Sequence, residues 1–137
     1  MESASDAQGR LRDLAALAAD GGVSRIEVLQ VPQDILTRTR LTPEMIEEQF
    51  YYKLVFQRRR GSVPWAKIAN AMKNTSVTPE TEPSDLRWGI LLYSEGGDRI
   101  GAVYFDSTGR HGYVDKNSVS FTGDLFPWVR ATFSNWL

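Results

Sequence analysis

Residues 87–121, RWGILLYSEGGDRIGAVYFDSTGRHGYVDKNSVSF, decide the fold of this 137-residue chain. Runs rich in β-branched and aromatic side chains cover 87–94, 99–105, 110–114 and 119–121. The first three runs are separated by the turn-forming sequences Glu95-Gly96-Gly97-Asp98 and Asp106-Ser107-Thr108-Gly109. Strands with turn residues at this spacing are typical of successive hairpins, so the stretch predicts an antiparallel meander.

Helices are predicted on both sides of the meander. Leucine and alanine recur at helical spacing over about 6–19 and are followed by Gly21-Gly22, which favours a helix end. Thr42 followed by Pro43 is typical of a helix start, and that helix runs to about Gln49. A third helix is predicted to end near Lys73, and a fourth, amphipathic helix to run from about 123 to 136.

Two further strands and one loop complete the prediction. Residues 23–31 are rich in β-branched side chains and predict a strand. Residues 50–57 could extend the preceding helix, but their aromatic and β-branched content favours a strand. Residues 74–86 hold threonine, serine and proline with hardly a large apolar side chain, which predicts a long surface loop.

Together these elements predict a single α+β domain over residues 1–137. We expect an antiparallel sheet of five or six strands with helices packed on one face. Strand alternation and helical spacing direct one set of side chains towards a common interior. The predicted core residues are Trp88, Ile90, Leu92, Val103, Phe105, Trp128 and Val129.

Composition removes several kinds of chemistry. The chain is 42% hydrophobic and 24% charged, as in an ordinary globular domain, and it contains no cysteine and one histidine, His111. Disulfides, thiol catalysis, zinc–thiolate sites and iron–sulfur clusters are therefore excluded. The polar, acidic start of the chain and its short apolar runs predict a cytoplasmic protein without a membrane span.

Charge is segregated along the chain, although the net charge is only −1. Residues 1–35 carry six acidic and three basic side chains, residues 36–73 three and eight, and residues 74–137 eight and five. A basic middle therefore lies between two acidic ends. Such asymmetry bears on the choice of partners rather than on the fold.

An enzyme would have to rely on the residues around His111. Asp106 and Asp115 could supply a carboxylate beside the imidazole, with Arg110 nearby, and this is the minimum for general acid–base catalysis. However, Asp106 and Gly109 are ordinary turn formers, and no side chain lies in a motif that marks a nucleophile. Metal-ligand and phosphate-loop spacings are also missing, so we expect no catalysis, no metal and no cofactor.

Nucleic-acid binding is the alternative hypothesis. The basic residues Arg58, Arg59, Arg60 and Lys67 follow Tyr51, Tyr52 and Phe56, a mixture of cations and rings that is typical of single-strand binders. The sequence pI near 5.8 speaks against a broad basic field.

The segment from Trp88 to Trp136 resembles small bacterial immunity proteins, which are encoded beside toxin genes. The resemblance lies in Tyr104-Phe105-Asp106, Gly109, Gly112-Tyr113-Val114-Asp115, Val119-Ser120-Phe121 and the final helix with Trp128. It implies a protein that binds and neutralises a cognate toxin, with a nuclease as the expected class. Acidic side chains suit a surface that covers a cationic nuclease site. The predicted partner-binding residues are Glu95, Asp98, Asp106, Arg110, His111 and Asp115.

Overall fold

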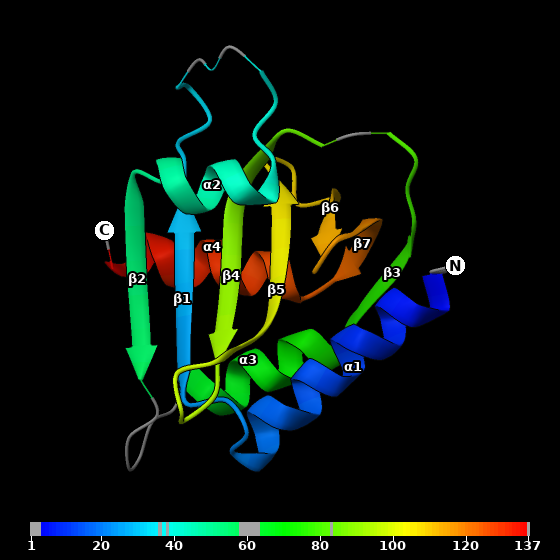
Figure 1. Cartoon of the computed structure of the whole chain (residues 1–137), viewed down its shortest axis with the longest axis vertical. Coiled ribbons are helices and arrows are strands. Elements are labelled where there is room, and N and C mark those ends of the chain that lie inside the picture. The colour runs from blue at the N-terminus through cyan, green and yellow to red at the C-terminus, as the bar shows by residue number, and fades with distance from the viewer. Residues whose placement is uncertain (1–3, 36, 38, 58–63, 83, 137) are drawn as a thin grey trace.

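The computed structural model describes residues 4–35, 37, 39–57, 64–82 and 84–136 (Figure 1). The helices of this described part are α1 (Ala4–Asp20), α2 (Pro43–Gln49), α3 (Pro64–Lys73) and α4 (Leu125–Trp136). Its strands are β1 (Arg25–Gln30), β2 (Tyr52–Gln57), β3 (Thr75–Pro79), β4 (Leu86–Tyr93), β5 (Arg99–Asp106), β6 (His111–Val114) and β7 (Asn117–Gly123). The predicted meander is confirmed as β4 to β7, and residues 50–57 contain a strand.

The strands form one antiparallel sheet in the order β2-β1-β4-β5-β6-β7-β3. The α+β class is therefore confirmed. Seven strands are present in the described residues, where the sequence predicted five or six. The additional strand is β3, which pairs with β7 at the end of the sheet, whereas β2 forms the other edge.

The prediction of a surface loop over 74–86 is wrong for the residues that form β3. Thr75 and Val77 alternate with exposed neighbours and are 2% and 6% exposed. An edge strand with one buried face needs only alternate side chains in the core, so few large apolar residues suffice. A count of large apolar residues therefore fails to predict the strand formed by residues 75–79.

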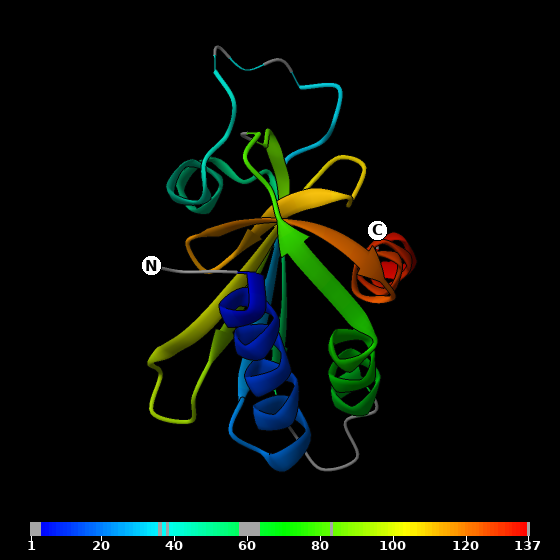
Figure 2. The same cartoon turned by 90° about the vertical axis from the view of Figure 1, so that its right-hand side faces the viewer.

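Helices cover both faces of the sheet, and Figure 2 shows α2 and α4 on opposite sides of it. On one face α1, α3 and α4 bury Leu11, Ile68 and Val129 against the sheet. On the other face α2 inserts Ile46, which is fully buried in a smaller cluster with Leu29, Leu91 and Tyr104. The prediction of helices on one face thus holds for three helices but not for α2. The reason is that β4 is buried on both of its faces and needs cover on both.

The larger core contains most of the predicted interior residues. Six of the seven side chains are buried, and Trp128 is half-buried at the border of the core. Phe133 anchors α4 between two aromatic rings, because its ring lies edge-on to Trp88 at 5.2 Å and to Tyr52 at 6.2 Å between centroids. These contacts hold the final helix across β2, β1 and β4.

Candidate functional site

The predicted partner-binding residues do not form one patch. Glu95 and Asp98 lie in the turn between β4 and β5, where the Ser94 N–H donates to the Asp98 carbonyl at 2.8 Å. Asp106 and His111 lie at the opposite end of β5, in and after the next turn. Successive turns of a meander fall at alternate ends of the strands. The acidic residues are therefore divided between the two ends of the sheet.

Asp115 occupies a third position and is engaged in holding the fold. It lies between β6 and β7 with a φ of 53°. Its Oδ1 accepts a hydrogen bond from the Ala102 N–H at 2.9 Å, and its Oδ2 accepts one from Arg10 Nε at 2.7 Å. The carboxylate thus ties the β6–β7 turn to β5 and to α1, and its role in partner binding stays a prediction.

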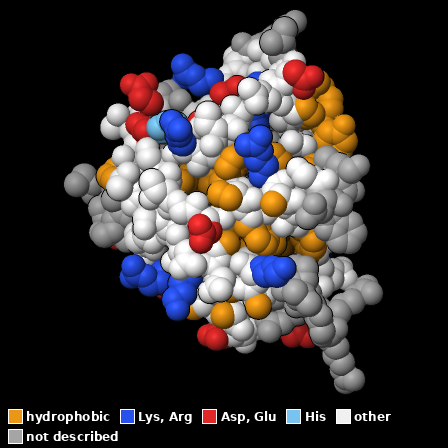
Figure 3. All heavy atoms as spheres, turned by 180° about the vertical axis from the view of Figure 1, so that it is seen from behind, with side chains coloured by type: hydrophobic (Ala, Val, Ile, Leu, Met, Phe, Trp, Pro, Cys, Tyr) orange, Lys and Arg blue, Asp and Glu red, His pale blue; other side chains and the backbone are white. Residues whose placement is uncertain are grey.

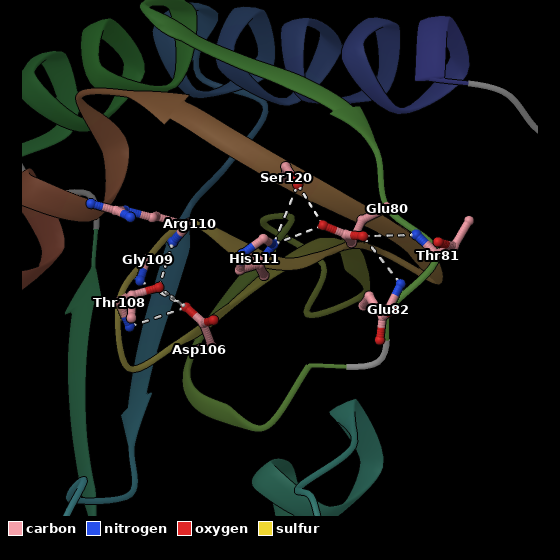
Figure 4. A network of polar contacts seen from close by, with 9 residues as sticks. All are labelled: Glu80, Thr81, Glu82, Asp106, Thr108, Gly109, Arg110, His111 and Ser120. Carbon is pink, nitrogen blue, oxygen red and sulfur yellow. Dashed lines mark hydrogen bonds and ion pairs between the residues drawn. The ribbon is translucent and has the colours of Figure 1, made fainter.

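Asp106 organises the turn between β5 and β6. Its Oδ1 accepts hydrogen bonds from the backbone N–H of Thr108 at 3.1 Å and of Gly109 at 2.8 Å, and from the Thr108 hydroxyl at 2.8 Å (Figure 4). Gly109 has a φ of 73°, and a Cβ there would overlap the ring of Phe126. The turn interpretation of Asp106 and Gly109 is therefore confirmed.

His111 contacts a carboxylate that the sequence did not single out. Its Nδ1 lies 2.9 Å from Glu80 Oε2 and 3.3 Å from Ser120 Oγ, and Ser120 Oγ donates to Glu80 Oε2 at 2.9 Å (Figure 4). Glu80 follows β3 directly, and its N–H continues the pairing with β7 by donating to the Ser118 carbonyl at 3.2 Å. Recognition of β3 as a strand beside β7 is the signal that would have placed Glu80 here.

The Glu80 carboxylate is held in its ionised form. Its Oε1 accepts hydrogen bonds from the backbone N–H groups of Thr81 at 3.0 Å and of Glu82 at 3.1 Å. The hydrogen bonds from Glu82 N–H and from Ser120 lower the pKa of Glu80, and the nearby His111 lowers it further. The carboxylate of Glu80 is therefore fixed in position at this end of the sheet, beside the imidazole of His111.

The contacts of His111 differ from those of a catalytic relay. In a nucleophile–base–acid relay the imidazole lies between two partners, one on each ring nitrogen. Here Ser120 and Glu80 both approach Nδ1, and the serine donates directly to the carboxylate. Ser120, His111 and Glu80 thus form a hydrogen-bonded network on one side of the imidazole.

A depression of about 250 Å³ opens beside this network. We call it the acidic pocket, and it is lined by Glu80, Glu82, Ser84, Asp85, Asp106, Ser107 and His111. Ser84 is 7% exposed, and its Oγ has no hydrogen-bond partner among the described residues. In Figure 3 acidic side chains lie beside the histidine on one side, and a basic side chain adjoins it on the other.

Of the two arginines close to the acidic pocket, one pairs with a carboxylate of its wall and the other points away. Arg87 contacts Asp85 at 2.9 Å, but its guanidinium also donates to the carbonyls of Pro32 and Ile35 on the far side. The Arg110 side chain extends away from Glu80 (Figure 4). No cation in the described part of the chain pairs with Glu82 or with Asp106, so the pocket keeps a negative field.

A larger groove of about 870 Å³ lies between α1, α2 and β5, and four of its charged side chains form two ion pairs. Glu47 binds Arg99 and also accepts a hydrogen bond from the Tyr104 hydroxyl at 2.7 Å. Burial and this hydrogen bond raise the pKa of Tyr104. Arg10 pairs with Asp115 at the other side of the groove. These two ion pairs reduce the field that the groove presents to a charged partner.

The residues of the nucleic-acid hypothesis are only partly described. Arg58, Arg59 and Arg60 lie outside the described residues, and Lys67 is exposed on α3. Tyr51 and Tyr52 are 58% and 44% exposed, whereas Phe56 packs against the larger core. Lys53 forms an ion pair with Glu27 at 3.3 Å, and Glu27 also pairs with Arg25 at 3.3 Å. This hypothesis stays a prediction.

Comparisons with known proteins do not assign the chain to a family. Searches against family models, curated proteins and solved structures gave no match. Among the described helices, none combines the length and the apolar character needed to cross a membrane. Function is therefore inferred from the geometry of the chain itself.

Proposed function

We propose that this protein is an immunity protein that binds and neutralises a cognate bacterial toxin, with a nuclease as the toxin class. The observation that carries the proposal is the acidic pocket. Its carboxylates come from the β3–β4 connection and the β5–β6 turn, and they surround a depression of about 250 Å³. Asp106 and His111, two of the predicted partner-binding residues, line this pocket.

Preorganisation makes the acidic pocket suitable for protein recognition. Glu80 is held through both of its oxygens, and Asp106 is held through Oδ1. Carboxylates that are already fixed lose little side-chain entropy when a cation arrives. The charge of Glu82 and the Oδ2 of Asp106 are then available to a lysine or arginine of the partner, and such charge-assisted hydrogen bonds are short and strong.

A nuclease is the partner class that this chemistry fits. Enzymes that bind polyanionic substrates present cationic surfaces, and an acidic inhibitor surface speeds association with them. The hydroxyl of Ser84, which has no hydrogen-bond partner among the described residues, adds a neutral donor and acceptor at the wall of the same pocket. The proposal requires binding alone and no chemical step.

Co-expression with the neighbouring toxin gene tests the proposal. We expect the toxin domain to be lethal alone and harmless together with this chain. The double variant Glu82→Gln/Asp106→Asn removes two charges of the pocket, while the amide of asparagine can still accept the turn hydrogen bonds. The control Glu95→Gln/Asp98→Asn removes the same charge at the opposite end of the sheet.

Protection should fall for the pocket variant and persist for the control. Equal protection by both variants would place the toxin contacts elsewhere, and absence of any toxin gene beside this one would overturn the immunity proposal itself. Binding of the purified chain to a labelled single-stranded oligonucleotide tests the nucleic-acid alternative. A single-strand binder must retain the oligonucleotide at low salt and release it as the salt concentration rises. No retention at low salt excludes that alternative.

A further inference from the structure

The two edge strands of the sheet, β3 and β2, differ in whether a side chain forms hydrogen bonds with their outward-facing N–H and C=O groups. At β3 the Val77 N–H donates to Gln8 Oε1 at 2.8 Å, and Gln8 Nε2 donates to the Thr75 carbonyl at 3.3 Å. One glutamine amide of α1 thus bonds as a neighbouring strand would. The strand then ends at Pro79, which has no N–H to offer.

The β2 edge lacks such protection in the described part of the chain. Sheet order places β2 at the end, with β1 as its single described neighbour. Its sequence, Tyr52 to Gln57, contains neither proline nor a carboxylate. Four of the five exposed large hydrophobic side chains of the described residues lie in or next to this strand, namely Phe50, Tyr51, Tyr52 and Val55. Figure 3 shows apolar side chains gathered at the margin of the rear face on the β2 side.

The register shows which backbone groups of β2 point outward. The Val31 N–H donates to the Arg87 carbonyl at 2.9 Å, so Val31 faces β4. Bonding direction alternates along an antiparallel strand, and Val28 therefore faces β2. Val28 lies opposite Leu54 in the pairing of β1 with β2. Leu54 consequently bonds to β1, and its two chain neighbours turn their N–H and C=O groups away from the sheet.

We propose that β2 pairs antiparallel with β2 of a second copy of this chain, so that one sheet continues across a two-fold axis. Pairing centred on Leu54 places Lys53 of each copy opposite Val55 of the other, and these residues exchange backbone hydrogen bonds. Tyr52 then lies opposite Phe56 of the other copy, and Leu54 opposite its own counterpart. Apolar and aromatic cross-strand pairs of this kind stabilise a sheet.

The charges of β2 favour a second copy of this strand as its partner over a polyanion. Lys53 is the one charged side chain of β2, and in the proposed register it faces Val55 rather than the lysine of the second copy. It also remains paired with Glu27 of its own chain at 3.3 Å. A second β2 buries the exposed rings of this edge without placing like charges directly opposite each other, whereas a polyanion would leave these rings without an apolar partner.

Val55→Lys tests the proposal with a variant that keeps its fold. Val55 is 49% exposed, so a lysine there can extend into solvent, and the parent's pairing of Glu27 with Lys53 does not depend on the valine. In the dimer the same lysine would lie opposite Lys53 of the other copy, and like charges directly opposite destabilise a pair. Val55→Thr is the matched control, because it keeps the β-branched shape without the charge.

Sedimentation of the full chain over a range of concentrations should show a monomer–dimer equilibrium for the parent and for Val55→Thr. We expect Val55→Lys to weaken the dimer by about tenfold or more. Amide hydrogen exchange locates the contact: the outward N–H groups of Lys53 and Val55 should be protected in the dimer and exchange rapidly on dilution. The Val77 N–H, which bonds to Gln8, should be protected in both states. A parent that stays monomeric at millimolar concentration, or a dimer that Val55→Lys leaves intact, would overturn the proposal.

Discussion

At the β3 side of the molecule hydrogen bonds between side chains and backbone hold the sheet edge, whereas at the β2 side aromatic packing does. Gln8, Thr75 and Glu80 satisfy backbone groups on and around β3, and the contact of Glu80 fixes one carboxylate of the acidic pocket. Phe133 packs on Tyr52 and Trp88 at the other side, where large apolar side chains remain exposed. The difference separates two kinds of surface: a charged one suited to a cationic partner and an apolar one suited to another strand.

The largest effect is expected on the β2 side. Phe133→Ala removes a ring that is 2% exposed and leaves a cavity between Trp88 and Tyr52. The free energy of unfolding should fall by about 3 to 5 kcal/mol, as measured by chemical denaturation. Ser134→Ala, on the exposed side of the same helix, should change it by less than about 0.5 kcal/mol. A loss below about 1 kcal/mol for Phe133→Ala would mean that aromatic packing does not hold α4.

A smaller loss is expected from the hydrogen bonds of the β3 side. Thr75 is 2% exposed, and its hydroxyl donates to the Ala71 carbonyl at 2.8 Å and accepts from the Leu125 N–H at 2.9 Å. Thr75→Val keeps the shape but leaves both groups without this partner, which should cost about 1 to 3 kcal/mol. Denaturant midpoints should show no comparable change for Thr78→Val, at an exposed position of the same strand. If Thr75→Val and Thr78→Val lower the free energy of unfolding equally, the hydrogen bonds of the Thr75 hydroxyl do not stabilise this side of the sheet.

Gln8→Ala tests the protection of the β3 edge itself. The variant frees the Val77 N–H and the Thr75 carbonyl, and the loss of stability should be about 1 kcal/mol. Hydrogen exchange of the Val77 amide should accelerate, while the Thr78 amide, which faces β7, should stay protected. If the Val77 amide exchanges at an unchanged rate, another group covers this edge and the contrast with β2 is weaker.

The smallest expected effect is the contribution of Glu80 to the pH dependence of stability. Hydrogen bonds lower the pKa of Glu80 below its ordinary value of 4.5, so the folded chain binds fewer protons there than the unfolded chain. The stabilisation is complete above that ordinary value and is lost as the pH falls through the lowered pKa. Thermal unfolding of the parent and of Glu80→Gln should therefore converge as the solution is acidified. A difference that is constant with pH would contradict this assignment.

Local signals in the sequence predict much of the fold. Thr42-Pro43 marks the start of α2, and the turns after Ser94 and Phe105 mark the meander, because these signals depend on backbone preferences of a few neighbouring residues. β3 has no such signal. Its strand character arises from pairing with β7 and from burial of Thr75 and Val77, which are properties of the folded chain.

The candidate site was predictable only in part, for the same reason. Asp106 and His111 lie close in sequence to their turn and could be placed there. Glu80 could not, because only the pairing of β3 with β7 brings it to His111. The sequence also predicted one binding surface for Glu95 and Asp106, whereas the structure puts them at opposite ends of β5, because successive turns of a meander lie at alternate ends of its strands.

Association kinetics with the toxin domain of the neighbouring gene test the central claim most directly. The parent, the pocket variant Glu82→Gln/Asp106→Asn and the control Glu95→Gln/Asp98→Asn should be compared at low and high salt. Steering by the acidic pocket predicts that the pocket variant associates about tenfold more slowly at low salt, that the control stays close to the parent, and that high salt reduces the difference. Equal association rates for the two variants would contradict the proposal that the acidic pocket recognises the toxin.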